Sequence, residues 1–176
     1  MMSLNDLRSR IPDYAKDLRL NLESVLSEAG APGLDPRQVR AVAFASAIAS
    51  RHRPLAEALE NEASALLSPA ELAGVRAAAA MMAMTNVYYR FTHLLSNKEY
   101  ETMRAGLRMN VMRDPGIDKA SFELCALAVS AINGCGACVD SHEKTLREHG
   151  VSAQGVQSAA RIAAVVHAVA VTLEQA

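Results

Sequence analysis

The spacing of the apolar residues restricts this chain to a helical fold. They recur three and four positions apart rather than alternating, which is the period of amphipathic helices, and no stretch has the pattern of a strand. Alanine, the strongest helix former, is abundant. The chain has 176 residues, 51% of them apolar, which is enough to form one hydrophobic core but hardly a second. We therefore predict an all-α fold of about eight helices in one domain, residues 1–176.

Capping signals mark several helix starts. Asp35-Pro36 opens one helix, Ser68-Pro69-Ala70-Glu71 opens another with proline at its first position, and Ser152 opens the last. The segment 114–118, Asp-Pro-Gly-Ile-Asp, predicts a turn before a further helix. Short turns should therefore join the helices.

Two matches at one offset suggest an internal duplication. Ser46-Ala47-Ile48 recurs 84 residues later as 130–132, and Leu67-Ser68 ahead of an alanine-rich helix recurs as Val151-Ser152. The chain would then consist of a degenerate first half, about 1–95, and a second half, about 96–176. In this register Arg51 lies opposite Cys135, Pro54 opposite Cys138 and Ala58 opposite His142. The second half would carry the chemistry and the first would be scaffold.

The charge pattern bears on partners and location. Lysine and arginine number 18 against 19 acidic residues, without runs of one sign, so neither a basic stripe for nucleic acid nor a polybasic membrane helix is present. The polar N-terminus is interrupted by Pro12, and we expect no secretion signal and no apolar run of spanning length. We predict a cytoplasmic protein that binds small molecules and proteins, with no nucleic acid and no membrane.

Two of the three cysteines, Cys135 and Cys138, have C-x-x-C spacing. Because structural disulfides are rare in a reducing compartment, this pair indicates catalysis or metal binding. The helix breakers Asn133-Gly134 precede the pair and Gly150 follows as a C-terminal cap, so both cysteines should lie in the first turn of a helix. The helix dipole there favours thiolates, the form that attacks peroxides and disulfides.

His142 shares one helical stripe with both cysteines. At about 1.5 Å per residue it lies roughly 6 Å along the axis from Cys138 and roughly 10 Å from Cys135. We therefore predict that His142 is the base for Cys138, with Cys138 the nucleophile and Cys135 the resolving thiol. The alternative is a zinc site in which both cysteines and His142 are ligands. His149 is too far along the helix to complete it and is interpreted as a cation at the helix C-terminus.

Glu123 begins an almost wholly apolar helical run in which Cys125 should be an inert core residue. The carboxylate is either a first-turn charge facing water or a buried group whose raised pKa requires a partner. His142 is the obvious partner, and the pair would complete a proton relay to the cysteine.

The motifs together resemble the AhpD alkyl hydroperoxide reductases, relatives of the carboxymuconolactone decarboxylases. The resemblance runs nearly end to end and is densest around the cysteines. The segments that carry it are Ile11–Asp17, Leu20-Asn21-Leu22, Asn86–Arg90, Gly106–Asn110, Pro115-Gly116-Ile117, Phe122-Glu123-Leu124, Ala128–Cys135, Cys138, His142-Glu143 and Thr145–Arg147.

This resemblance implies an all-α homotrimer that defends against organic hydroperoxides as partner of the peroxiredoxin AhpC. Cys138 would be the peroxidatic thiol, passing through a sulfenic acid or a mixed disulfide with AhpC. Cys135 would be the proton donor and resolving thiol in a 135–138 disulfide, and Glu123 with His142 would form the relay. Electrons would come from dihydrolipoamide on the lipoylated acyltransferase of a 2-oxoacid dehydrogenase complex, so the chain would need no bound cofactor and no metal.

One position departs from the family pattern. Some members carry a histidine directly before the second cysteine, where this chain has Ala137. If that histidine acidifies the peroxidatic thiol, direct peroxidase turnover should be slower here. Two further classes of function stay open: a redox-sensing or zinc-binding module that uses the same pair, and a decarboxylase or lactonase, against which the C-x-x-C itself argues.

Overall fold

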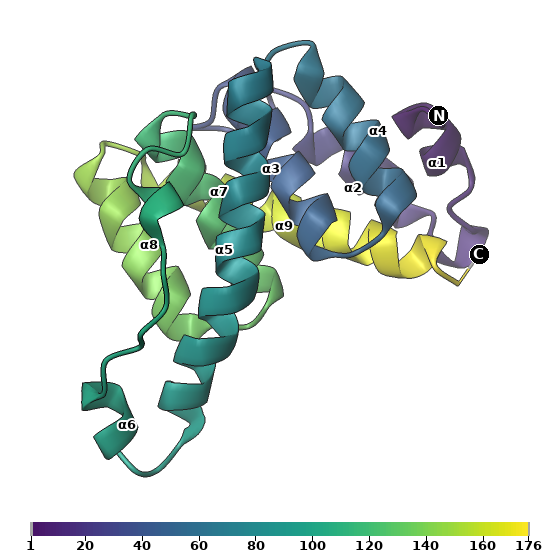
Figure 1. Ribbon diagram of the computed structural model, residues 1–176. Helices are drawn as coiled ribbons and strands as arrows, with labels where there is room; N and C mark the ends of the chain where they lie inside the picture. The colour runs from purple at the N-terminus through teal and green to yellow at the C-terminus, as the bar shows by residue number, and fades with distance from the viewer. Residues whose placement is uncertain (1, 176) are drawn as a thin grey trace.

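The computed structural model describes residues 2–175, within which the chain forms nine α-helices, two 3-10 helices and no strand (Figure 1). The predicted all-α fold in one domain is confirmed. The elements are α1 (Leu4–Ser9), η1 (Asp13–Ala15), α2 (Asp17–Val25), α3 (Pro36–Ala49), α4 (Arg53–Ser64), α5 (Pro69–Leu94), α6 (Glu99–Thr102), η2 (Asn110–Met112), α7 (Lys119–Ile132), α8 (Gly136–Glu148) and α9 (Ala153–Leu173).

Side chains cap the helices at the starts that the sequence predicted. Asp35 and Ser68 each accept a hydrogen bond from the backbone of the third helical residue, Gln38 and Glu71, whose side chains bond back to the cap. Ser152 caps α9 through the N–H of Gly155. These contacts satisfy backbone groups that would otherwise be orphaned, which is why the helices begin where they do.

The central helices α3 and α7 pack against each other. Every residue of α7 from Ser121 to Ser130 is buried, and a helix that is apolar on all sides belongs in a core. Helices α5, α8 and α9 pack around α7, and α4, α5 and α9 around α3. The core thus lies around α3 and α7, and α8, which begins at the cysteine pair, packs directly on α7.

Helix α9 corrects one expectation, because by length and composition it is apolar enough to cross a membrane. Its apolar residues have a partner inside the protein. The helix packs on α2, α3 and α7, and Ile162, Val166 and Val169 are fully buried in these contacts. Packing therefore accounts for an apolar run that sequence inspection had not singled out.

The helices of the two halves follow the same order, α3-α4-α5 and then α7-α8-α9. The joints show that the predicted register is wrong by one residue around the cysteines. Arg51 and Gly134 follow α3 and α7 with φ of 62° and 69°, and His52 and Cys135 are the N-caps of α4 and α8. The offset is one residue shorter here than at the caps of α5 and α9, because α8 has 13 residues and α4 has 12.

In the corrected register Leu55 and Leu59 stand opposite Cys138 and His142. Both leucines are fully buried. Helix α1 packs on α4 and so covers part of the first half, whereas α2 packs on α9. Duplication itself stays a prediction, but apolar packing occupies the place that the cysteine and histidine take in the second half.

Helix α5 continues beyond the body of the molecule into an arm (Figure 1). From the end of α5 the chain turns through α6 and returns along α5 to η2, which contacts that helix. Large apolar side chains on the arm are open to solvent, with Leu94 78% and Phe91 47% exposed. The returning segment brings η2 close to α8 and forms one wall of the cavity that contains Cys138.

Candidate active site

Cys135 is the joint between two helices. Helix α7 ends in a Schellman motif: Gly134 takes φ of +69°, its N–H bonds to the carbonyl of Ala131, and the N–H of Cys135 bonds to the carbonyl of Ser130 at 3.0 Å. Cys135 is at the same time the N-cap of α8. Cys138 follows in the first turn, as predicted, where unpaired N–H groups favour a thiolate.

Cys135 and Cys138 form a disulfide, with their Cα atoms 5.3 Å apart. The two sulfur-bearing residues differ in access. Cys135 is 1% exposed, whereas Cys138 is 7% exposed and lines a cavity. A small molecule that enters the cavity therefore meets Cys138 first.

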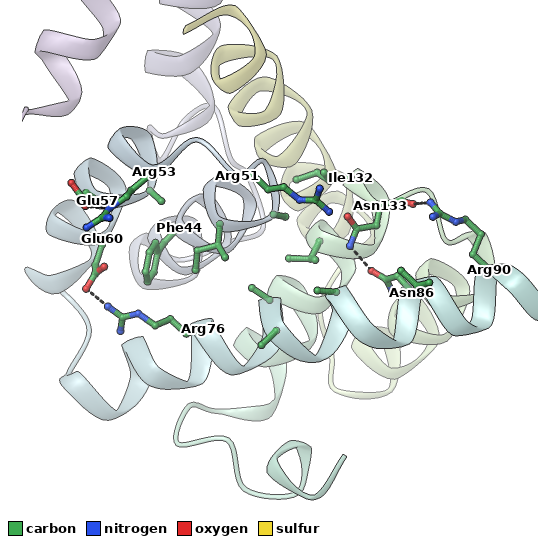
Figure 2. A pocket seen from close by; sticks show the side chains of 18 residues that line it. Phe44, Arg51, Arg53, Glu57, Glu60, Arg76, Asn86, Arg90, Ile132 and Asn133 are labelled. Carbon is green, nitrogen blue, oxygen red and sulfur yellow. Dashed lines mark hydrogen bonds and ion pairs between the residues drawn. The ribbon is translucent and has the colours of Figure 1, made fainter. Parts of the chain in front are cut away.

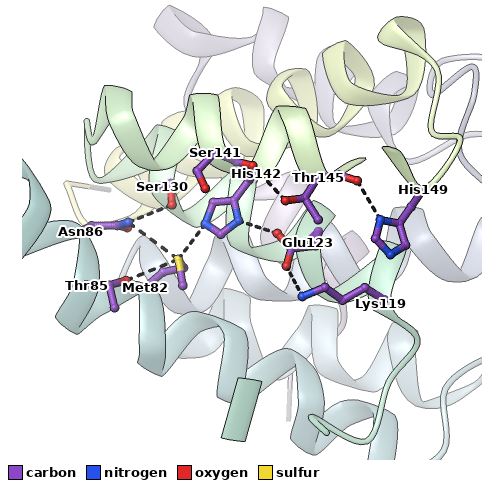
Figure 3. A network of polar contacts seen from close by, with 10 residues as sticks. All are labelled: Met82, Thr85, Asn86, Lys119, Glu123, Ser130, Ser141, His142, Thr145 and His149. Atoms are coloured by element: carbon purple, nitrogen blue, oxygen red, sulfur yellow. Dashed lines mark hydrogen bonds and ion pairs between the residues drawn. The ribbon is translucent and has the colours of Figure 1, made fainter. Parts of the chain in front are cut away.

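Glu123 and His142 face each other across the contact between α7 and α8 (Figure 3). Nδ1 of His142 donates to Oε2 of Glu123 at 2.6 Å, and both residues are buried. Of the two alternatives for Glu123, the buried group with a histidine partner is the one observed. The relay geometry that the sequence suggested between these two residues is present.

The pKa of Glu123 moves in the direction opposite to that expected for a buried carboxyl. Burial raises this pKa, but hydrogen bonds from His142 and Lys119 outweigh burial and hold the pKa below its usual range. Nζ of Lys119 lies 2.6 Å from Oε1 of Glu123. Each carboxylate oxygen thus has its own donor, and Glu123 stays ionised beside the imidazole.

The second ring nitrogen of His142 faces a thioether. Nε2 lies 3.1 Å from Sδ of Met82 on α5, and within the described chain neither ring nitrogen is bonded to a cysteine sulfur. Because Glu123 accepts the Nδ1 proton, Nε2 is the atom left to exchange protons with a group in the cavity. That His142 serves Cys138 stays a prediction in this disulfide form.

A cavity of about 390 Å³ lies between α5, α8 and the segment around η2. Its size suits a small organic substrate. Ala137, the position at which the sequence departs from the pattern expected of the family, lies in its wall. The lining residues are Met82, Thr85, Tyr89, His93, Met109, Met112, Ala137, Cys138, Ser141 and His142.

Asn86 on α5 holds the residues just before the cysteine pair (Figures 2 and 3). Its fully buried amide donates to Oγ of Ser130 at 2.9 Å and accepts from the side chain of Asn133 at 2.9 Å. Arg90, one turn further along α5, donates to the carbonyl oxygen of Asn133. These bonds connect α5 to the residues just before Gly134 and fix the position of the disulfide.

A second cavity, of about 660 Å³, lies on another face of α5 (Figure 2). Asn133 and Arg90 stand at one end of it. None of the four predicted site residues lines it, and two of its arginines are already paired, Arg53 with Glu57 and Arg76 with Glu60. The cavity beside Cys138 is therefore the candidate active site.

The remaining candidates lie away from this cavity. Cys125 is buried, and burial raises the pKa of its thiol, as expected of an inert core cysteine. His149 is the C-cap of α8, and its Nδ1 bonds to the carbonyl oxygen of Thr145 at 2.8 Å, which is the predicted position at the helix C-terminus.

Comparison with known proteins decides the family. Residues 98–176 match the Carboxymuconolactone decarboxylase family. Over nearly the full chain, the protein is similar to proteins named alkyl hydroperoxide reductase AhpD. It is 54% identical to that of Bradyrhizobium sp. (strain BTAi1 / ATCC BAA-1182), covering 99% of this chain and 95% of the relative. It is 55% identical to that of Streptomyces coelicolor, covering 98% and 96%. The chain belongs to the AhpD family. The resemblance found in the sequence is confirmed, and so is the class of enzyme, an oxidoreductase.

Sequence reasoning missed three residues of this AhpD-family site. Met82 and Lys119 contact His142 and Glu123, and Asn86 holds the residues just before the cysteine pair. Lys119 had a local signal, because it stands four residues before Glu123 and such pairs meet on a helix. Met82 and Asn86 come from α5. Asn86 had a signal, because a polar residue in a helix that packs in the core needs a partner, whereas no local pattern marks Met82.

Proposed function

We propose that this chain is a lipoyl-dependent alkyl hydroperoxide reductase that uses Cys135 and Cys138 as a dithiol/disulfide pair. The observation that carries the proposal is the unequal access of the two cysteines: Cys138 opens into the cavity that His142 also lines, whereas Cys135 is buried behind it. The names of the relatives supply the substrate class, alkyl hydroperoxides.

In the proposed cycle the Cys138 thiolate attacks the distal oxygen of the hydroperoxide. The O–O bond breaks, the Cys135 thiol gives its proton to the departing alkoxide, and an alcohol and a Cys138 sulfenic acid result. The Cys135 thiolate then attacks the sulfenic sulfur, and hydroxide leaves as water with a proton from His142. The product is the 135–138 disulfide, the form that the structure contains.

The buried pair positions the proton-transferring group. Glu123 accepts from Nδ1 of His142, which orients the ring and leaves Nε2 to accept the proton of Cys138 and later return it. Lys119 keeps Glu123 ionised, so the carboxylate stabilises the imidazolium while it holds the proton.

We propose dihydrolipoamide, carried by the acyltransferase of a 2-oxoacid dehydrogenase complex, as the reductant, and AhpC as the protein partner. The same thiolate, Cys138, would attack the AhpC disulfide and form the mixed disulfide that Cys135 resolves. Thiol exchange alone carries these steps, so the chain would work without a bound cofactor, in a cytoplasm that keeps thiols reduced.

We also propose a homotrimer. Exposed apolar side chains gather on the arm and the outer end of α5, at Val87, Phe91, Leu94, Tyr100 and Met103. A patch of this kind is typical of a protein–protein contact. Light scattering after gel filtration tests the assembly, and replacement of Phe91 and Leu94 by serine should weaken it.

The central experiment compares Cys138→Ser with Cys135→Ser. Cys138→Ser should abolish hydroperoxide consumption with dihydrolipoamide, lipoamide dehydrogenase and NADH. Cys135→Ser should keep a thiol that reacts once with hydroperoxide and then stops. Equal single-turnover reactivity in the two variants contradicts the assignment of Cys138. Running the assay with and without AhpC separates direct peroxidase flux from reduction of the peroxiredoxin.

A further inference from the structure

The sulfur of Met82 is surrounded by polar nitrogen and oxygen atoms (Figure 3). Nε2 of His142 lies 3.1 Å from it, Oγ1 of Thr85 3.6 Å and Nδ2 of Asn86 3.8 Å. A thioether is a weak acceptor. Thr85 and Asn86 also have good oxygen acceptors, Met81 and Ser130 respectively. Among the described residues, Nε2 of His142 has only this sulfur.

Met82 also lines the cavity that contains Cys138, although its side chain is almost fully buried from bulk solvent. In the disulfide form Cys138 has no thiolate with which to attack a hydroperoxide. The thioether then becomes a nucleophile available to a hydroperoxide in this cavity. Nε2 of His142 is the neighbouring group that can relay a proton.

We propose that Met82 is a modification site, oxidised to methionine sulfoxide by hydroperoxide when the enzyme is in the disulfide form, and that this oxidation inactivates the enzyme. The proposal rests on the proposed function, because it requires hydroperoxides to enter this cavity.

The reaction balances without a further reagent. A lone pair of Sδ attacks the distal peroxide oxygen and the O–O bond breaks. The hydroxysulfonium that forms gives the proton of the former distal oxygen to Nε2 of His142, and Nε2 passes it to the departing alkoxide, while Glu123 keeps accepting the Nδ1–H. Sulfur loses two electrons, the peroxide gains two, and the products are the sulfoxide and an alcohol. His142 ends the step with the same number of protons as it began.

The sulfoxide would change the role of His142. Its oxygen is a strong acceptor placed beside two donors and Nε2 of His142, where a weak acceptor stood before. It would favour a proton on Nε2 and hold there the proton that the cycle needs to exchange with Cys138. Reductant would protect the enzyme, because it shortens the time spent as disulfide. Inactivation would therefore appear when hydroperoxide is abundant and dihydrolipoamide is scarce.

The test incubates the disulfide form with tert-butyl hydroperoxide without reductant and follows each methionine by tandem mass spectrometry. Exposure alone predicts that Met2, 36% exposed and outside the apolar patch of the arm, oxidises before Met82, 2% exposed. We expect the reverse, with Met82 gaining one oxygen several-fold faster and peroxidase activity falling in step. Oxidation in the order of exposure overturns the proposal.

Two variants separate Met82 from the other methionines of the cavity. Met82→Leu should retain most of its own untreated activity after peroxide, while Met109→Leu should lose activity as the parent does; equal loss in both overturns the proposal. Turnover of untreated enzyme is measured in parallel. If the untreated enzyme turns over normally but its methionines oxidise in the order of their exposure, only this inference is contradicted. If Met82 is oxidised selectively but the untreated enzyme does not turn over, only the proposed function is contradicted.

Discussion

Glu123 and His142 lie 19 residues apart in the chain and 2.6 Å apart in the structure, on two helices that pack against each other. The contact is buried, and a buried carboxylate is tolerated here because both of its oxygens have a cationic or hydrogen-bonding partner. The orientation of the imidazole therefore depends on a group that never enters the cavity.

Replacing Glu123 by glutamine should expose this dependence. The amide has nearly the same shape, but it can donate to Nδ1 and so stabilise the tautomer with the proton on Nε2. We expect kcat/KM for hydroperoxide to fall by about 100-fold, the scale of a lost general base. A steady-state assay checks this, with circular dichroism to show that the fold is kept. Unchanged kcat/KM would remove Glu123 from the relay.

Lys119 should determine how much stability Glu123 contributes and over which pH range that contribution is lost in acid. The folded-state pKa of Glu123 is lowered, so its contribution to stability is present above the unfolded pKa and is lost as pH falls through the folded pKa. Lys119→Met removes one of the groups that lower this pKa, so the loss in acid should be smaller and complete at a higher pH, whereas Lys119→Arg should behave like the parent. Urea unfolding between about pH 3 and pH 7 measures it; coincident acid limbs for all three proteins would contradict it.

Substitutions at the two corresponding positions with positive φ, one after α3 and one after α7, should change the free energy of unfolding in opposite directions. Gly134 and Arg51 both have positive φ, a conformation that costs a residue with a side chain about 1 kcal/mol. Gly134→Ala should therefore lower the free energy of unfolding by about 1 kcal/mol, since no neighbouring atom would obstruct the added methyl group. Arg51→Gly should raise it, by less, because glycine also gains freedom in the unfolded chain. Chemical denaturation compares them, and effects of the same sign would contradict the argument.

Asn86 should matter for both stability and activity. Asn86→Ala leaves the buried hydroxyl of Ser130 and the side-chain amide of Asn133 without their partner, which should lower the free energy of unfolding by about 1–3 kcal/mol. The residues just before the cysteine pair lose their connection to α5, so hydroperoxide turnover should also fall. Ser130→Ala, which removes a single bond, is the matched control and should cost less in both measurements. A variant with full turnover would show that the residues just before the cysteine pair are held by their backbone alone.

Local chemistry explains which features were predictable. The caps at Ser68 and Ser152 and the joint at Gly134 depend on a few neighbouring residues, so they were visible in the sequence. The pairing of Glu123 with His142 followed from a buried charge that needed a partner. The place of Met82 beside His142 depends on how α5 packs on α8, and no local pattern reports a crossing between helices. The predicted 84-residue register between the halves was wrong around the cysteines because α8 is one residue longer than α4, and sequence similarity between these two helices is lost.

The burial of Cys135 has a kinetic consequence. In the proposed cycle one sulfur of the disulfide is enclosed, so oxidant and reductant would reach the protein through the same opening and react at the same atom, Sγ of Cys138. The two could not be bound together, and each turnover would alternate between two half-reactions. Initial rates at several fixed hydroperoxide concentrations should give parallel double-reciprocal lines against dihydrolipoamide, and high concentrations of either substrate should inhibit by occupying the wrong form of the enzyme.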